Sequence, residues 1–184
     1  MTIDRRKVLI GLSAAAALAA GAAQAQGAKP APSKKDMVYL DLKDGRVVIQ
    51  LRPYLAPKHV AQIKTLVKRG FYDGIVFHRV IEGFMAQTGD PKGTGTGGSD
   101  LPNIPAEFTA TPFRRGTLGM ARSQLPNSAN SQFFICFREA SFLNNQYTVF
   151  GEVVSGMEFV DKIKRGEPPV NPDKIIKMSL ADPS

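Results

Sequence analysis

Residues 77–90, with the sequence FHRVIEGFMAQTGD, combine side chains that could act on a substrate without a metal ion. In an extended strand alternate side chains share a face, so Arg79 is expected among apolar neighbours. A guanidinium is seldom buried in such surroundings unless it is paired. Further along the segment, Met85 and Gln87 share a face of their own. The segment therefore predicts a permanent cation, an amide and a thioether close to several aromatic rings.

The residues alone leave two interpretations of Arg79 open. In the first, its guanidinium faces a substrate as a fixed hydrogen-bond donor. In the second, it forms a structural ion pair with a carboxylate such as Glu107, and the aromatic rings only fill the core.

A second candidate for chemistry is a nucleophile–base pair made of Cys136 and His78, which would indicate a cysteine hydrolase. Cys136 lies in the apolar run 133–137, where a thiol is more often a small core residue. His78 sits between Phe77 and Arg79, and a hydrogen-bonded structural role is the more common one for such a histidine. We therefore favour structural roles for both.

The chain offers little for a metal ion or a nucleotide cofactor. One cysteine and two histidines exclude a disulfide framework and a cysteine-based zinc cage, and leave few ligands for other metals. The glycine run GTGTGG at 93–98 contains a bare G-x-G-x-x-G, but loop-forming residues surround it where a dinucleotide site needs a strand and a helix. We expect no metal and no cofactor.

The charge and length indicate an ordinary soluble domain. Lys and Arg number 24 against 16 Asp and Glu, which gives a formal charge of +8 over 184 residues. The basic residues are spread along the chain without a block, so we expect a solvated surface and no nucleic-acid binding. The length fits one domain with a single large core.

The N-terminal part of the chain resembles an export signal. A basic stretch at residues 5–7 precedes an apolar run at 8–23, and residues 1–25 end in Ala-Gln-Ala, a typical cleavage site. We expect a cleaved signal peptide over 1–25, a flexible leader over 26–35 and one domain over 36–184. The paired arginines are compatible with twin-arginine export, and the Sec route stays open. After cleavage no membrane attachment is expected.

Short strands and two helices are expected to hold the candidate residues. An Asp-Gly pair at 44–45, between apolar segments at 37–42 and 47–51, predicts a β-hairpin. Further short strands are expected at 76–81, 85–88, 117–121, 132–136, 149–154 and 174–180. A first helix should begin at Pro57 and end at Gly70, and a second should span about 157–164. This pattern favours an antiparallel β-barrel or sandwich with helical caps.

A series of motifs, in order along the chain, resembles the cyclophilin family of peptidyl-prolyl cis-trans isomerases. The motifs are residues 77–90, GTGTGG at 93–98, IPAEF at 104–108, GMAR at 119–122, SQFFI at 131–135 and the FG pair at 150–151. The similarity covers about residues 38–180. It implies a mainly β fold, a closed eight-stranded antiparallel β-barrel capped by two α-helices.

The resemblance also implies the residues of the site. Arg79 would be the catalytic arginine, and Gln87 would hydrogen-bond the substrate backbone. Phe84 is the third residue of the implied catalytic set. The proline ring would enter an apolar pocket formed by Phe84, Met85, Phe134 and Leu143.

The resemblance also implies four further substrate-binding residues, three of which depart from the common pattern of the family. Ala121 and Arg122 match the pair beside the residue that precedes proline, where many members have asparagine in place of Arg122. Phe142 stands where many members have tryptophan, and Tyr147 where many have histidine. Loss of the indole N–H donor implies weak cyclosporin binding.

The expected function is isomerisation of X–Pro peptide bonds, without covalent chemistry, by a bacterial member exported to the periplasm. Arg79 would stabilise the twisted imide while the apolar pocket holds the ring. Its partners would be proline-containing polypeptides and unfolded exported proteins, and we expect a monomer. The alternative is a non-catalytic chaperone module that binds proline-containing peptides through the same pocket.

Overall fold

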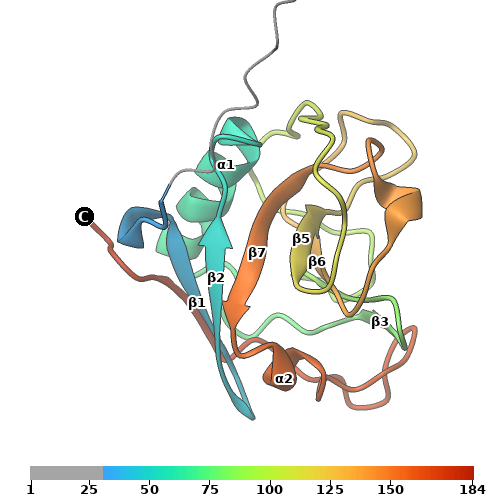
Figure 1. Cartoon of the computed structure of the whole chain (residues 1–184). Coiled ribbons are helices and arrows are strands. Elements are labelled where there is room, and N and C mark those ends of the chain that lie inside the picture. The colour runs from blue at the N-terminus through green and yellow to red at the C-terminus, as the bar shows by residue number, and fades with distance from the viewer. Residues whose placement is uncertain (1–30) are drawn as a thin grey trace, which may run out of the picture. The chain divides into compact units, whose positions relative to one another are not determined.

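The computed structural model of the chain describes residues 31–184 (Figure 1). The expected signal peptide at 1–25 lies outside the described residues, as do residues 26–30 of the expected leader. The end of that leader contributes to a short 3-10 helix, η1 (Lys34–Asp36), directly before the first strand.

Eight strands form one antiparallel sheet in the order β3-β4-β6-β5-β7-β2-β1-β8. The strands are β1 (Met37–Leu42), β2 (Gly45–Leu51), β3 (Arg79–Ile81), β4 (Met85–Thr88), β5 (Thr117–Met120), β6 (Phe133–Cys136), β7 (Val149–Ser155) and β8 (Lys177–Leu180). Strands β1 and β2 form the hairpin that the Asp-Gly pair predicts, with Leu42 opposite Gly45. The mainly β architecture is therefore confirmed.

The prediction of a closed barrel is wrong. β3 and β8 lie at the two edges of the sheet and share no ladder, so the sheet curls into an open half-barrel. Between these edges only isolated bridges form, joining Val80 to Gly166 and Val76 to Lys174. The chain between the bridged positions contains Pro168, Pro169 and Pro172, which have no N–H to donate to a ladder.

The helices differ in how well their lengths follow the sequence. α1 (Pro57–Lys68) begins at the predicted residue and ends two residues before the predicted Gly70. Gly70 has a φ of 65°, a left-handed conformation that favours glycine after a helix. α2 (Met157–Val160) is shorter than the predicted 157–164, because the bonds after it are turn-like, such as Ile163 N–H to the Val160 carbonyl. No helix within residues 31–184 is long and apolar enough to cross a membrane.

Strand β6 separates two apolar clusters, and this separation positions the site. Phe133 and Ile135 point into the main core with α1 and the β1–β2 hairpin. Phe134 and Cys136 point to the other face, into a smaller cluster that includes Met85 on β4. Because side chains alternate along a strand, one face of β6 packs into the main core and the other face packs into the smaller apolar cluster.

Candidate active site

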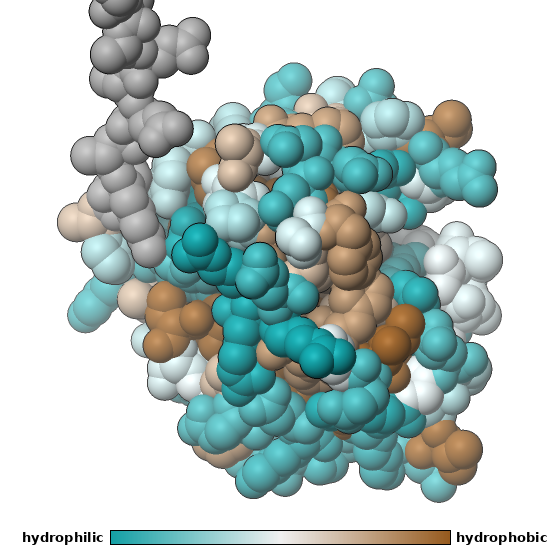
Figure 2. Space-filling view, turned by 45° about the vertical axis from the view of Figure 1, so that its right-hand side comes forward, coloured by the Kyte–Doolittle hydropathy of each residue, from teal (hydrophilic) through white to brown (hydrophobic). Residues whose placement is uncertain are grey.

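A pocket of about 910 Å³ opens at the smaller apolar cluster. Ten of its lining residues are those that the resemblance implies: Arg79, Phe84, Met85, Gln87, Ala121, Arg122, Phe134, Phe142, Leu143 and Tyr147. The others are His78, Gly93, Thr94, Gly95, Gln146, Glu167 and Pro168. Figure 2 brings the right-hand side of Figure 1 forward and shows apolar residues in the middle of a mostly hydrophilic face.

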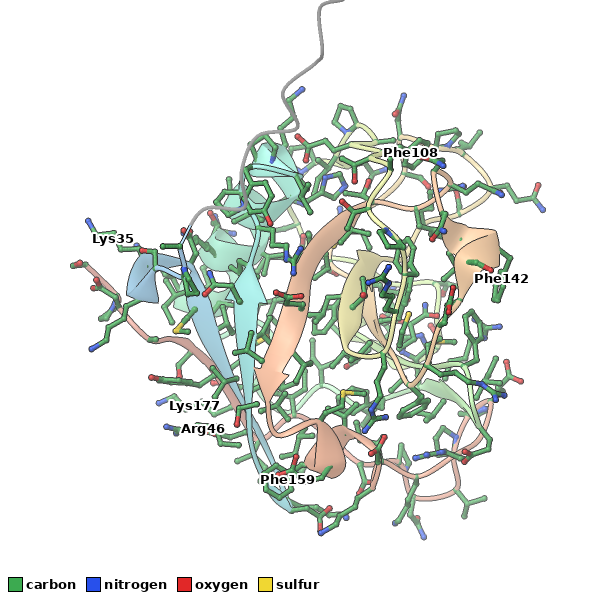
Figure 3. All side chains as sticks on the ribbon, in the orientation of Figure 1. Lys35, Arg46, Phe108, Phe142, Phe159 and Lys177 are labelled. Atoms are coloured by element: carbon green, nitrogen blue, oxygen red, sulfur yellow. The ribbon has the colours of Figure 1, made fainter. Side chains whose placement is uncertain are left out.

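One end of the pocket is apolar. Met85 and Phe134 are almost fully buried in its wall, on the paired strands β4 and β6. The Phe134 ring lies 5.7 Å from that of Phe113 and 5.9 Å from that of Tyr147, which fixes its orientation. Phe142, on the 3-10 helix η2 (Ser141–Leu143), is 64% exposed at the right-hand side of Figure 3. This end can therefore take up a small apolar ring from solvent.

Arg79 stands at the polar side of the pocket, opposite Gln87 in the β3–β4 ladder. Its Nε donates to Glu167 Oε1 at 2.8 Å, and its side chain is 43% exposed. Glu107 is not the carboxylate that pairs with Arg79, because it accepts hydrogen bonds from the backbone N–H groups of Lys58 and His59 instead. The carboxylate paired with Arg79 is that of Glu167. Arg79 is therefore an accessible cation beside an apolar hollow.

The amide of Gln87 belongs to a chain of hydrogen bonds. Its Nε2 donates to Gln132 Oε1 at 2.9 Å, and Gln132 Nε2 donates in turn to the carbonyls of Gly95 and Gly97 at 3.0 and 2.8 Å. The chain fixes the Gln87 side chain against the glycine loop rather than against Arg79.

The glycine loop is built around one carboxylate. Asp90 accepts hydrogen bonds from the backbone N–H groups of Lys92, Thr94 and Gly95 at 2.6–3.0 Å. Burial alone would raise the pKa of Asp90, but these bonds and that of Gly97 hold it below its usual value. A Cβ on Gly97 would lie 2.0 Å from Asp90 Oδ1, so the close approach of the loop to this carboxylate requires glycine at position 97.

Arg122 joins two turns at the rim. Its guanidinium donates to the carbonyls of Ser123, Gln124 and Gln146, with the shortest bond at 2.8 Å. It also lies 4.6 Å from the centre of the Tyr147 ring. The side chain of Arg122 is thus engaged in hydrogen bonds within the protein.

Cys136 and His78 do not form a nucleophile–base pair. Cys136 is fully buried outside the pocket lining, and burial raises the pKa of its thiol to about 12. His78 lines the pocket, but neither of its ring nitrogens has a hydrogen-bond partner among residues 31–184. The expectation that His78 is hydrogen-bonded is therefore wrong, while the structural role of Cys136 agrees with its burial.

Comparison with known proteins decides the family. The family profile described as "Cyclophilin type peptidyl-prolyl cis-trans isomerase/CLD" matches residues 37–180. The chain belongs to the cyclophilin family. It is accordingly an isomerase enzyme of the peptidyl-prolyl cis-trans type.

Relatives and solved structures agree with this assignment. A probable peptidyl-prolyl cis-trans isomerase of Brucella suis is 58% identical over 188 residues, covering 92% of this chain and 94% of the relative. A cyclophilin of Hirschia baltica superposes with a TM-score of 0.75 at 29% identity, covering 80% of this chain and 74% of that one. A Cryptosporidium parvum cyclophilin, solved in the presence of the dipeptide Ala-Pro, gives 0.73 at 29% identity, covering 78% and 98%.

Four residues around the pocket of this cyclophilin were not found from the sequence: Gln132, Gln146, Glu167 and Pro168. Gln132 lies within the SQFFI motif, so the motif could have indicated it. Glu167 and Pro168 come from the chain between α2 and β8, where no pattern marks them. Among residues 31–184, no three His, Cys, Asp or Glu side chains are grouped so that they could hold a metal ion.

Two buried histidines should make the stability of this cyclophilin fall in mild acid. Burial lowers the pKa of His59 despite the opposing effect of Glu107, and burial with the Arg79 charge lowers that of His78 despite Asp90. In the unfolded chain both histidines therefore take up protons near pH 6.5, whereas in the folded chain they take them up only at lower pH. We expect the free energy of unfolding to have its full value above pH 6.5. Below pH 6.5 it should fall by up to about 1.4 kcal/mol per pH unit for each histidine.

Urea unfolding at pH 7.5, 6.5 and 5.5 measures this dependence. The replacement His78→Leu should flatten it, because one of the two groups no longer titrates. Carboxylates do not produce the effect in this range, since unfolded Asp and Glu take up protons only near pH 4. An equal unfolding free energy at pH 7.5 and 5.5 would contradict the prediction that the two buried histidines have lowered pKa values in the folded chain.

Proposed function

We propose that the pocket binds the proline of an X–Pro segment and that Arg79 lowers the barrier to rotation of the preceding peptide bond. The observation that carries this proposal is the position of Arg79, a half-exposed guanidinium that lines the same pocket as the buried apolar side chains of Met85 and Phe134. The Ala-Pro dipeptide present with the Cryptosporidium parvum cyclophilin supports proline as the bound group.

The reaction needs no nucleophile. An X–Pro bond interconverts over tens to hundreds of seconds because rotation breaks amide resonance, with a barrier of about 18–20 kcal/mol. In the twisted state the prolyl nitrogen regains a basic lone pair. A guanidinium hydrogen bond to that nitrogen therefore forms in the transition state and not in the planar ground state, which is the requirement for catalysis.

The apolar end and the polar side of the pocket would have different roles in the reaction. Phe84, Met85, Phe134 and Leu143 would hold the ring while the preceding carbonyl turns, and Gln87 would hydrogen-bond the substrate backbone. A rise from about 10⁻² s⁻¹ to about 10² s⁻¹ needs about 5–6 kcal/mol. One charge-assisted hydrogen bond, desolvation of the amide and a fixed backbone are together of that size.

We further propose that the clients are exported proteins in the periplasm. The basis is the export-type sequence at residues 1–25, which lies outside the described residues. Fusion of residues 1–30 to a reporter, followed by fractionation of the cells, tests this part. A reporter that stays in the cytoplasm would contradict it.

A protease-coupled assay tests the catalytic proposal. Chymotrypsin cleaves only the trans form of an X–Pro-Phe peptide, so an isomerase increases the rate of the slow phase. We expect a slow phase that accelerates in proportion to the protein concentration. A rate equal to the thermal rate, with peptide binding retained, would instead indicate the proline-peptide-binding chaperone.

The replacement Phe142→Trp should tighten cyclosporin binding by about tenfold. The exposed Phe142 ring lies 5.2 Å from that of Phe84 at the pocket rim, and an indole there adds an N–H donor. A hydrogen bond contributes about 0.5–1.5 kcal/mol, and about 1.4 kcal/mol is a factor of ten. Calorimetric titration of both proteins gives the two affinities. Equal affinities would show that Phe142 does not correspond to the family's tryptophan.

A further inference from the structure

Glu167 carries the one carboxylate among the described residues that line the pocket. One of its oxygens accepts the Nε–H of Arg79 at 2.8 Å, and Nε is the guanidinium donor nearest to the aliphatic part of the side chain. The two terminal NH₂ groups of Arg79 are the donors farther from the backbone. A carboxylate on Nε therefore fixes the plane of the group without using those donors.

The backbone holds Glu167 at this place. The preceding residue, Gly166, exchanges two hydrogen bonds with Val80, each at 2.8 Å, and Val80 is the neighbour of Arg79 on β3. Pro168 follows directly, and proline limits the freedom of the backbone. In Figure 1 the red-brown chain after α2 runs past the green strand β3. The backbone of Glu167 is thus held beside β3, and this brings its exposed carboxylate to Arg79.

Gln87 does not serve this purpose. It faces Arg79 across the β3–β4 ladder, but its amide donates to Gln132, which in turn donates to the glycine loop. Within residues 31–184, the hydrogen bond from Nε to Glu167 is the one that the structure gives the Arg79 side chain. Orientation of the guanidinium therefore depends on Glu167.

We propose that Glu167 is a positioning residue for Arg79, and this proposal rests on the function proposed above. An arginine side chain has many rotamers, and fixing them before the substrate binds removes an ordering cost from the transition state. By holding Nε, Glu167 aims the terminal NH₂ groups at the prolyl nitrogen. Its contribution acts on the rotation step, and substrate binding by the apolar end is unaffected.

The first test is steady-state kinetics of Glu167→Ala and Glu167→Gln. We expect Glu167→Ala to lower kcat by about five- to tenfold with less than a twofold change in KM, because orientation and not binding is lost. Glu167→Gln should retain at least half of the wild-type kcat, since its amide oxygen can still accept the Nε–H bond. Neither variant should lower Tm appreciably, because exposed ion pairs contribute little to stability.

Glu82→Ala is the matched control. Glu82 accepts the Nε–H of Arg165 at 2.7 Å, an ion pair of the same kind that does not involve Arg79 or the pocket. Its removal should leave kcat and KM at the wild-type values.

A second measurement does not depend on activity. The Arg79 Nε–H resonance of ¹⁵N-labelled protein, assigned by its loss in Arg79→Lys, should be sharp and protected from exchange in the wild type. It should broaden or exchange rapidly in Glu167→Ala and stay in place in Glu167→Gln and Glu82→Ala.

An unchanged or higher kcat in Glu167→Ala overturns the proposal, as does an equal loss in Glu167→Gln or an Arg79 resonance that does not respond. The proposed function fails separately, when the wild type shows no catalysis or Arg79→Ala keeps it. Loss of activity on replacing Arg79 together with wild-type kinetics on replacing Glu167 would leave the function standing and remove only the positioning role.

Discussion

The replacement Arg79→Ala is expected to lower kcat/KM for an X–Pro peptide by about 100- to 1,000-fold while Tm stays nearly unchanged. Removal of a single preorganised donor from a transition state typically has an effect of that size. The stability effect is small because the Arg79 side chain is 43% exposed and its ion-pair partner, the Glu167 carboxylate, is also exposed. Ion pairs of this kind contribute about 0–1 kcal/mol.

The chymotrypsin-coupled assay and a thermal melt of the same samples measure both quantities. Arg46→Ala is a suitable control, because Arg46 Nε also donates to a carboxylate, that of Asp41 at 2.7 Å, on the side of the molecule opposite Phe142 (Figure 3). It should keep full activity. A large drop in Tm with normal turnover for Arg79→Ala would instead support the structural ion pair that the residues alone left open.

The parts of the fold that follow from local sequence were predictable. The hairpin of β1 and β2 follows from an Asp-Gly turn between apolar segments, and α1 follows from its first-turn proline and the glycine after it. The edges of the sheet were not predictable in this way. Whether β3 pairs with β8 depends on the path of the chain between α2 and β8. The closed barrel was inferred from family resemblance, which did not take into account the prolines at 168, 169 and 172 in that part of the chain.

The site shows the same division between local and distant information. Motif resemblance placed ten residues in one pocket, because each motif brings its own side chains to a strand or turn. Glu167 was missed because it is 88 positions from Arg79, and no local pattern relates a loop carboxylate to a strand so far away. The Glu107 alternative failed for the same reason, since its partner, His59, lies on α1.

The replacement Phe134→Leu should lower kcat/KM by about tenfold or more and reduce stability by about 1–1.5 kcal/mol. Phe134 forms the wall of the pocket between Phe113 and Tyr147, and its ring is nearly buried. Leucine fills a similar volume but gives no flat face for the proline ring, and a misfit in an apolar pocket costs about 1–3 kcal/mol in the transition state. The same coupled assay and a urea titration measure the two effects.

Phe133→Leu separates the effect on the pocket from the effect on stability. Phe133 is the neighbour of Phe134 on β6, but its fully buried ring points into the main core and contacts Tyr72 and Phe150. Its replacement should reduce stability by a similar or larger amount and change kcat/KM by less than about twofold, because no pocket surface is altered. Equal activity losses in the two variants would mean that destabilisation explains both and that Phe134 does not hold the ring. A loss confined to Phe134→Leu assigns the proline to the face of β6 that carries Phe134 and Cys136.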